Sequence, residues 1–228
     1  MRRWIFRIDL LIGAALLAAL AYGGQGYIDA RRAAPELKAR AAALAAKGHG
    51  LDGINPDYLH ILILVEDPGF AVHRGIDLSN KGAGLTTMTQ SLSKRLAFRD
   101  FRPGLKKIRQ TGYALGLESS LSKEEILTLW LDLVPMGRDA EGHWTTGFHA
   151  ASLAFYGKPL QDLTEEEFIE LVSVPIAPAL LNPLKRGEDF EMRVRRITRR
   201  AAGECAPDSV RDVWLEGCAV PAAQSTRA

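Results

Sequence analysis

The sequence of 228 residues has little of what marks several protein classes. It contains only two cysteines, Cys205 and Cys218, and neither has the neighbouring histidines or cysteines of a zinc site. Its formal net charge is only +2, from 29 basic and 27 acidic residues, which gives no general attraction to nucleic acid. A chain of this size buries about 70% of its unfolded surface and so needs no disulfide framework. The composition argues against a zinc module or a nucleic-acid-binding protein and favours one globular domain.

The sequence leaves two states open for Cys205 and Cys218. In an oxidising compartment, a bridge between them would close a short loop and contribute about 3 kcal/mol in the chain-entropy model. Two unpaired, buried thiols are the alternative.

One long apolar run lies at the N-terminus. It follows three arginines within the first seven residues and extends from Leu10 to Tyr22 almost without polar side chains. A membrane-spanning helix needs roughly 20 apolar residues, which Trp4 to Gly23 provides, and the arginines place the N-terminal end inside. We predict an uncleaved single-pass anchor at residues 1–24 in the inner membrane, with Trp4 and Tyr22 at its two interfaces and the rest of the chain in the periplasm. The alternative is a signal peptide cleaved near residues 18–21, which exports the same domain.

The rest of the chain reads as mainly helical. Residues 25–50 are predicted to form a helical stalk, because the Ala-rich run from Pro35 to Lys47 has glycine past its end. Ser122 and Thr164 each begin a capping-box pattern. Further helices are expected at residues 86–97, 105–117, 126–133, 147–155, 168–174 and 190–202. We therefore predict an all-α or nearly all-α domain at residues 51–202, followed by a C-terminal tail at 203–228.

Two features of this helical reading remain open. The apolar run from Ile61 to Val65 suits either a strand or a core helix. The arginine-rich run at residues 193–200 is expected to be the solvated face of a helix.

A carboxylate pair directly follows that apolar run. Glu66 and Asp67 emerge from it, and His73 lies a few residues on. A carboxyl group at the end of a buried segment can have its pKa raised by desolvation, as a general base requires. A surface pair before a proline turn is the alternative that the residues alone leave open.

A second cluster combines hydroxyl groups with cations. The segment from Gly84 to Lys94 is rich in threonine and serine at an expected helix start, where free N–H groups favour anions. Gln90 and Lys94 are four residues apart and share a helix face. Further cations follow at Arg102, Lys106, Lys107 and Arg109. The pattern suits a wall that stabilises a pyrophosphate leaving group, or else a basic surface against anionic lipid headgroups.

The motifs around Glu66 and Lys94, and the segments that follow them, resemble in their order those of glycosyltransferase family 51, the peptidoglycan glycosyltransferases. Glu66-Asp67-x-x-Phe70-x-x-His73-x-Gly75-x-Asp77 is similar to the family's first motif, and residues 84–94 to its second. Residues 106–118 resemble the third motif, residues 130–158 the fourth region and residues 171–183 the fifth. The resemblance covers roughly residues 54–200 and implies a mainly α, lysozyme-like glycosyltransferase fold.

The resemblance also implies an activity, the polymerisation of lipid II onto a growing glycan chain. Glu66 would be the catalytic base that takes the proton of the acceptor 4-hydroxyl. The substrate-binding residues that it implies are Asp67, His73, Thr87, Gln90, Lys94, Arg102, Lys107 and Gln110. The implied partners are lipid II, the growing glycan and the membrane, together with penicillin-binding transpeptidases, since no penicillin-binding motifs follow the fifth block.

The sequence departs from the family pattern in several places. Gln110 stands where the family has its second glutamate, and an amide is a poor ligand for the divalent cation, such as Mg²⁺, that the resemblance would allow. We therefore assign no metal ligand and no definite cofactor, and a divalent cation stays only an implication of the resemblance. The span from Asp77 to Gly84 is shorter than in the family, and Leu85 and Ser91 replace a glycine and a glutamine. Two alternatives follow: an impaired member that binds lipid II or cell-wall synthesis partners, and a lysozyme-like cleaving enzyme.

Overall fold

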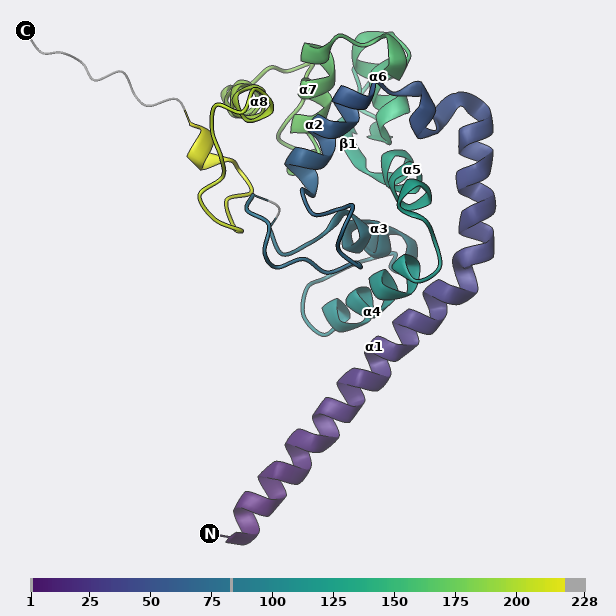
Figure 1. Ribbon diagram of the computed structural model, residues 1–228, viewed down its shortest axis with the longest axis vertical. Helices are drawn as coiled ribbons and strands as arrows, with labels where there is room; N and C mark the ends of the chain where they lie inside the picture. Colours follow the sequence, from purple (N-terminus) through teal and green to yellow (C-terminus); the bar gives the residue numbers. More distant parts are fainter. Residues whose placement is uncertain (1, 83, 220–228) are drawn as a thin grey trace, which may run out of the picture.

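The computed structural model describes residues 2–82 and 84–219, with side chains described from Arg7 onward. Within these residues the fold is mainly α, as predicted, with a long first helix that projects from a helical body (Figure 1). The α-helices are α1 Arg2–Leu44, α2 Pro56–Glu66, α3 Met88–Ala97, α4 Lys106–Glu118, α5 Lys123–Leu133, α6 Phe148–Tyr156, α7 Glu165–Ser173 and α8 Glu188–Ala201. A hairpin of β1 (Pro135–Arg138) and β2 (Trp144–Thr146) completes the body.

Local capping signals set several of these boundaries. Ser122 Oγ accepts a hydrogen bond from the Glu125 amide at 3.1 Å, and the Glu125 carboxylate accepts one from the Ser122 amide at 2.7 Å. Thr164 opens α7 with the same reciprocal pair, so both predicted capping boxes are confirmed. The run from Ile61 to Val65 is a core helix, because Asn55 caps α2 and Pro56 occupies its first turn.

Two local expectations need correction. The Ala-rich run from Pro35 to Lys47 is not a separate helix, because Pro35 lies inside α1, which continues from the apolar segment without a break. The helix ends through a π-helical turn, Ala45–His49, that contains Gly48 at φ 78°. The β1–β2 hairpin was not predicted, since strands of four and three residues are too short to show an alternating pattern.

The body is anchored on α1 by glycines. Gly112 of α4 lies against the backbone of Gly23, and Gly116 lies against Tyr27, so that the two helices cross at close range. Arg109 adds an ion pair to Asp29 at 2.8 Å. The helical body and the first helix therefore form one packed unit.

The N-terminal part of α1 carries exposed leucines and is long and apolar enough to cross a membrane. The expected interfacial position of Trp4 lies outside the side chains that the structure describes.

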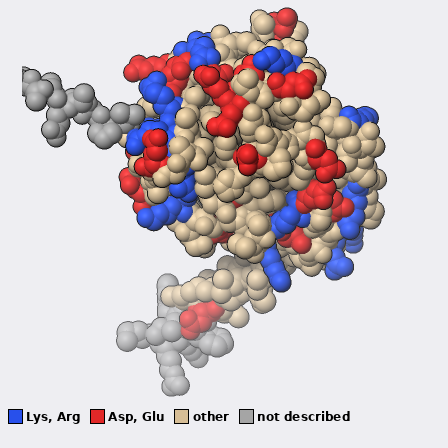
Figure 2. All heavy atoms as spheres, turned by 45° about the horizontal axis from the view of Figure 1, so that its top comes forward, with Lys and Arg blue, Asp and Glu red and all other residues tan. Residues whose placement is uncertain are grey.

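The core surrounds α5. Residues Ile126 to Leu131 of this helix are all buried, and Trp130 packs against Phe148 of α6, which in turn contacts Phe168 of α7. Figure 2 shows acidic and basic side chains interspersed on one face of this body, without an extended patch of one sign. This core holds the C-terminal end of α2, where Glu66 lies, opposite the start of α3.

The C-terminal tail is only partly described, since residues 220–228 lie outside the structure's description. Of the two states left open for the cysteines, the structure has the disulfide between Cys205 and Cys218.

Candidate active site

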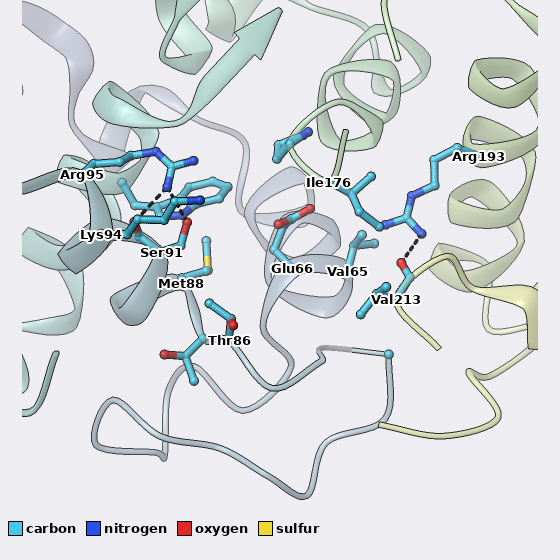
Figure 3. A pocket seen from close by; sticks show the side chains of 14 residues that line it. Val65, Glu66, Thr86, Met88, Ser91, Lys94, Arg95, Ile176, Arg193 and Val213 are labelled. Atoms are coloured by element: carbon cyan, nitrogen blue, oxygen red, sulfur yellow. Dashed lines mark hydrogen bonds between the residues drawn. The ribbon is translucent and has the colours of Figure 1, made fainter. Parts of the chain in front are cut away.

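A cavity of about 280 Å³ opens where α2, α3 and α8 meet (Figure 3). Its lining residues are Val65, Glu66, Gly82, Thr86, Thr87, Met88, Ser91, Lys94, Arg95, Trp130, Pro175, Ile176, Arg193 and Val213. The cavity thus collects residues from α2 to Val213, far apart in the sequence, around Glu66, the last residue of α2.

Glu66 is the central group of this cavity. It lies half-buried between Arg95 of α3 and Arg193 of α8 (Figure 3). Burial raises the pKa of the Glu66 carboxyl to about 7; Arg193 opposes that increase, the neighbouring Asp67 adds to it, and Arg95 also opposes it. A carboxyl with a pKa near neutrality can exchange a proton with a bound hydroxyl group, which is the requirement for a general base.

Asp67, the residue after Glu66, connects the end of α2 to the start of α3. Its fully buried carboxylate accepts hydrogen bonds from the Met88 amide at 2.8 Å and from His73 Nε2 at 2.9 Å. The Gly75 amide donates to His73 Nδ1 at 3.0 Å, so the ring proton lies on Nε2 and faces Asp67. Asp67 and His73 therefore join the turn after α2 to the start of α3, and neither lines the cavity.

The start of α3 is fixed by a second set of hydrogen bonds. Thr87 caps the helix by accepting from the Gln90 amide at 3.1 Å, and its hydroxyl donates to the Gly75 carbonyl at 2.9 Å. Lys107 of α4 donates to Gln90 Oε1 and to Thr86 Oγ1, both at 3.1 Å. Thr87 lines the cavity, whereas Gln90 and Lys107 lie behind its wall.

The cationic side of the cavity comes from α3. Lys94 is exposed, and its pKa is lowered by desolvation and by the neighbouring Arg95. Arg95 is held in place, because its Nη1 donates to the Ser91 carbonyl and hydroxyl, both at 2.8 Å. The two side chains place positive charge across the cavity from Glu66, where a departing anion would be stabilised.

The other two predicted residues lie elsewhere. Arg102 is 84% exposed, sits 3.4 Å from Asp100 and is not among the lining residues. Gln110 is buried on α4, where its Nε2 donates to the Gln90 carbonyl at 2.6 Å. The structure thus brings Glu66, Thr87 and Lys94 together around one cavity.

Sequence reasoning missed Arg95 and Arg193. Arg193 is only 2% exposed, so the expectation of a solvated face is wrong at this position. Burial lowers its pKa to about 10, while Glu66 opposes that shift, so Arg193 remains a cation at neutral pH. Its helix has an apolar side formed by Phe190, Val194 and Ile197, and Arg193 adjoins Val194 on that side, which was the available signal.

The lining residues do not suit a divalent cation. Among those that the structure describes, Glu66 is the only carboxylate, and it shares the cavity with three cationic side chains. Hard cations such as Mg²⁺ are usually held by carboxylates, and one carboxylate beside three cationic side chains is a poor site for them.

Comparison with known proteins places the chain in a family. The sequence model of the family described as Transglycosylase matches residues 36–202, so this chain belongs to the transglycosylase family. It is 30% identical to a protein of Cupriavidus necator named "Putative transglycosylase", over 87% of this chain and 89% of that protein.

Longer relatives match only through part of their length. Penicillin-binding protein 1A of Pseudomonas aeruginosa is 31% identical over 58% of this chain, and penicillin-binding protein 1C of Escherichia coli is 33% identical over 72%. The match spans 17% and 21% of those two proteins. The resemblance inferred from the sequence motifs is thereby confirmed.

Proposed function

We propose that this chain is a peptidoglycan glycosyltransferase that polymerises lipid II into glycan strands. The observation that carries the proposal is the position of Glu66, a carboxyl with a pKa near 7, across one cavity from Lys94 and Arg95. A base opposite a cationic wall suits the transfer of a sugar from a pyrophosphate to a hydroxyl group.

The proposed step needs only groups of the chain. The Glu66 carboxylate accepts the proton of the acceptor 4-hydroxyl as that oxygen attacks the anomeric carbon of the growing chain. The bond from this carbon to the lipid pyrophosphate breaks, and the configuration is inverted. Lys94 and Arg95 stabilise the negative charge on the departing pyrophosphate.

We further propose that α1 anchors the chain once in the inner membrane with the body on the periplasmic side. The apolar first part of α1 supports the anchor, and the disulfide supports an oxidising compartment. Such an anchor would hold the cavity beside lipid-linked substrates and beside penicillin-binding transpeptidases as partners.

A second candidate is binding of lipid II without transfer, which the buried amide of Gln110 favours. This position has no carboxylate, and its side chain is occupied by the Gln90 backbone. On this reading the cavity would retain the substrate but polymerise it poorly.

One assay separates these functions. The full-length protein in detergent micelles is incubated with labelled lipid II, and products are sized on a gel beside Glu66→Gln and the matched exposed control Glu124→Gln. Polymer from the wild type and the control, with none from Glu66→Gln, supports the proposal. Retained lipid II without any polymer supports the binding candidate. Short fragments released from preformed peptidoglycan would indicate a cleaving enzyme instead.

A further inference from the structure

The C-terminal segment, residues 205–218, has a fixed shape of its own. The Cys205–Cys218 disulfide joins its two ends. Inside it, the buried Asp212 carboxylate accepts hydrogen bonds from the amides of Asp208 at 3.0 Å, Glu216 at 2.6 Å and Gly217 at 3.0 Å. This central acceptor makes the segment a compact loop.

Helix α8 holds this segment by a row of arginines. The side chains at positions 193, 196, 199 and 200 are three, three and one residues apart and share one side of the helix. Their Nη1 atoms donate to the carbonyls of Val213 at 2.8 Å, Trp214 at 2.9 Å, Cys218 at 2.9 Å, Ala219 at 2.8 Å and Cys205 at 3.3 Å. Apart from the exposed Arg195, the basic run that was expected to face solvent is instead the donor surface for the C-terminal segment.

The segment reaches the cavity from this helix. Val213 is one of the lining residues, and its carbonyl accepts from the buried Arg193. On the other side, the amides of Gly82 and Gly84 donate to the carbonyls of Ser209 at 2.9 Å and Val210 at 2.8 Å. In Figure 1 the segment lies between α8 and the loop that follows α2.

The contact at Gly84 leaves no room for a larger residue. Gly84 has φ 71°, and a Cβ atom there would lie 2.9 Å from a methyl carbon of Val213. The short span after Asp77 is thus completed by backbone pairing with the C-terminal segment. Residues 203–219 lie beyond the match to the family model, which ends at residue 202.

We propose that the disulfide-closed segment 205–218 is a wall of the active site that positions Arg193 against Glu66 and fixes the loop at Gly82 and Gly84. This inference rests on the proposed transferase function. Arg193 is a positioning residue in this scheme, because it acts through Glu66.

The charged groups that face Glu66 determine how the segment affects the pKa of this carboxyl. They are Arg193 from α8, Arg95 and Lys94 from α3, and the neighbouring Asp67. Val213 holds Arg193 in place through its carbonyl. If the segment moves away, the guanidinium loses this partner and turns from Glu66, the pKa of Glu66 increases, and less of the base is ionised at neutral pH.

The test compares the oxidised full-length protein with Cys205→Ser/Cys218→Ser. We expect the double variant to have a kcat lower by about 10- to 100-fold, the range for a displaced catalytic geometry, with a smaller change in KM. The acid limb of its pH–rate profile should lie at higher pH. Hydrogen exchange should be faster in the peptide that contains Gly82 and Gly84. Adding reductant should move the wild type toward the double variant and leave the double variant unchanged.

Two further variants separate positioning from stability. Arg199→Met removes the contacts to Cys218 and Ala219 without touching the cavity or the disulfide, so we expect the same changes at smaller size, even if the double variant fails to fold. Arg195→Met, on the exposed side of α8, should leave the pH profile and the exchange unchanged.

The readouts also separate this inference from the proposed function. An unmoved acid limb and unchanged exchange at Gly82 and Gly84, in both the folded double variant and Arg199→Met, overturn the inference. If the oxidised wild type shows no transfer, the proposed transferase function is wrong. The inference is then wrong as well, even if slow hydrogen exchange at Gly82 and Gly84 shows that the segment packs against this loop.

Discussion

The side-chain amide of Gln110 donates a hydrogen bond to the main-chain carbonyl of Gln90, with the two atoms 2.6 Å apart. Both residues are buried, and the bond joins α4 to α3 behind the cavity. Gln110, which the motif resemblance matches to the family's second glutamate, therefore has a packing role here, and a carboxylate in the same place would face a carbonyl oxygen.

We expect Gln110→Glu to destabilise the fold and not to raise activity. Two acceptors would meet in a buried site, at a cost of about 1 to 3 kcal/mol in the free energy of unfolding. Burial would raise the pKa of the new carboxyl in the folded state. The cost should be small below about pH 4, where the acid is protonated in both states, and grow as pH increases. Thermal unfolding across pH measures it.

The matched control for that variant is Gln110→Met. It removes the donor without adding a charge, so its destabilisation should not change with pH. A Gln110→Glu protein that polymerises lipid II much faster than the wild type would contradict the packing role.

Glu66→Gln should lose transfer activity yet gain stability relative to the wild type as pH increases. Below the ordinary carboxyl pKa of 4.5, folded and unfolded wild type both hold the proton. Between pH 4.5 and about 7 the unfolded chain releases it and the folded chain keeps it, so wild-type stability decreases with pH. The glutamine does not titrate. The difference in melting temperature should therefore rise through this window and level off above it; a flat difference would mean that Glu66 has an ordinary pKa.

Lys94→Ala should impair transfer more than Arg102→Ala. Lys94 lines the cavity, whereas Arg102 is 84% exposed and lies beside Asp100. Removing a charge-stabilising donor costs about 10²- to 10³-fold in kcat where it acts in the transition state. We expect a loss in that range for Lys94→Ala and a few-fold change for Arg102→Ala. Steady-state kinetics with lipid II measure both, and equal losses would show that Arg102 reaches the substrate.

Gly112→Ala should weaken the packing of α4 on α1. An added Cβ would collide with the Gly23 backbone, and overpacking of this kind costs about 1 to 3 kcal/mol. Gly24→Ala is the matched control, because nothing lies within 4 Å of its Cβ position and alanine favours the helix by about 1 kcal/mol. Thermal unfolding in micelles should show a lower melting temperature for Gly112→Ala alone.

The elements with local signals were predictable from the sequence. The capping boxes at Ser122 and Thr164 predicted two helix starts, and the apolar spacing predicted the existence of α3, which begins two residues later than expected. Glu66 was predicted to lie at the end of a buried run, and in the structure it ends α2 and lines the cavity. These features depend on contacts between residues close in the chain.

The parts that were missed depend on contacts between distant residues. Arg193 is buried because Val213 supplies a carbonyl twenty residues away, and a basic run gives no sign of such a partner. The glycines of α1 and α4 allow close packing between the two helices, which can be recognised only once the helices are seen to cross. Pro35 stays inside α1 because the long helix overrides its local preference.

The uninterrupted α1 also sets a rotational register. Since α4 is locked onto the helix at Gly23 and Tyr27, the body can only turn about the helix axis together with its N-terminal part. Each residue inserted before Gly23 would rotate the body by about 100° and lift it by about 1.5 Å. Under the proposed anchoring, the direction in which the cavity opens over the bilayer is therefore encoded in the number of residues of one helix.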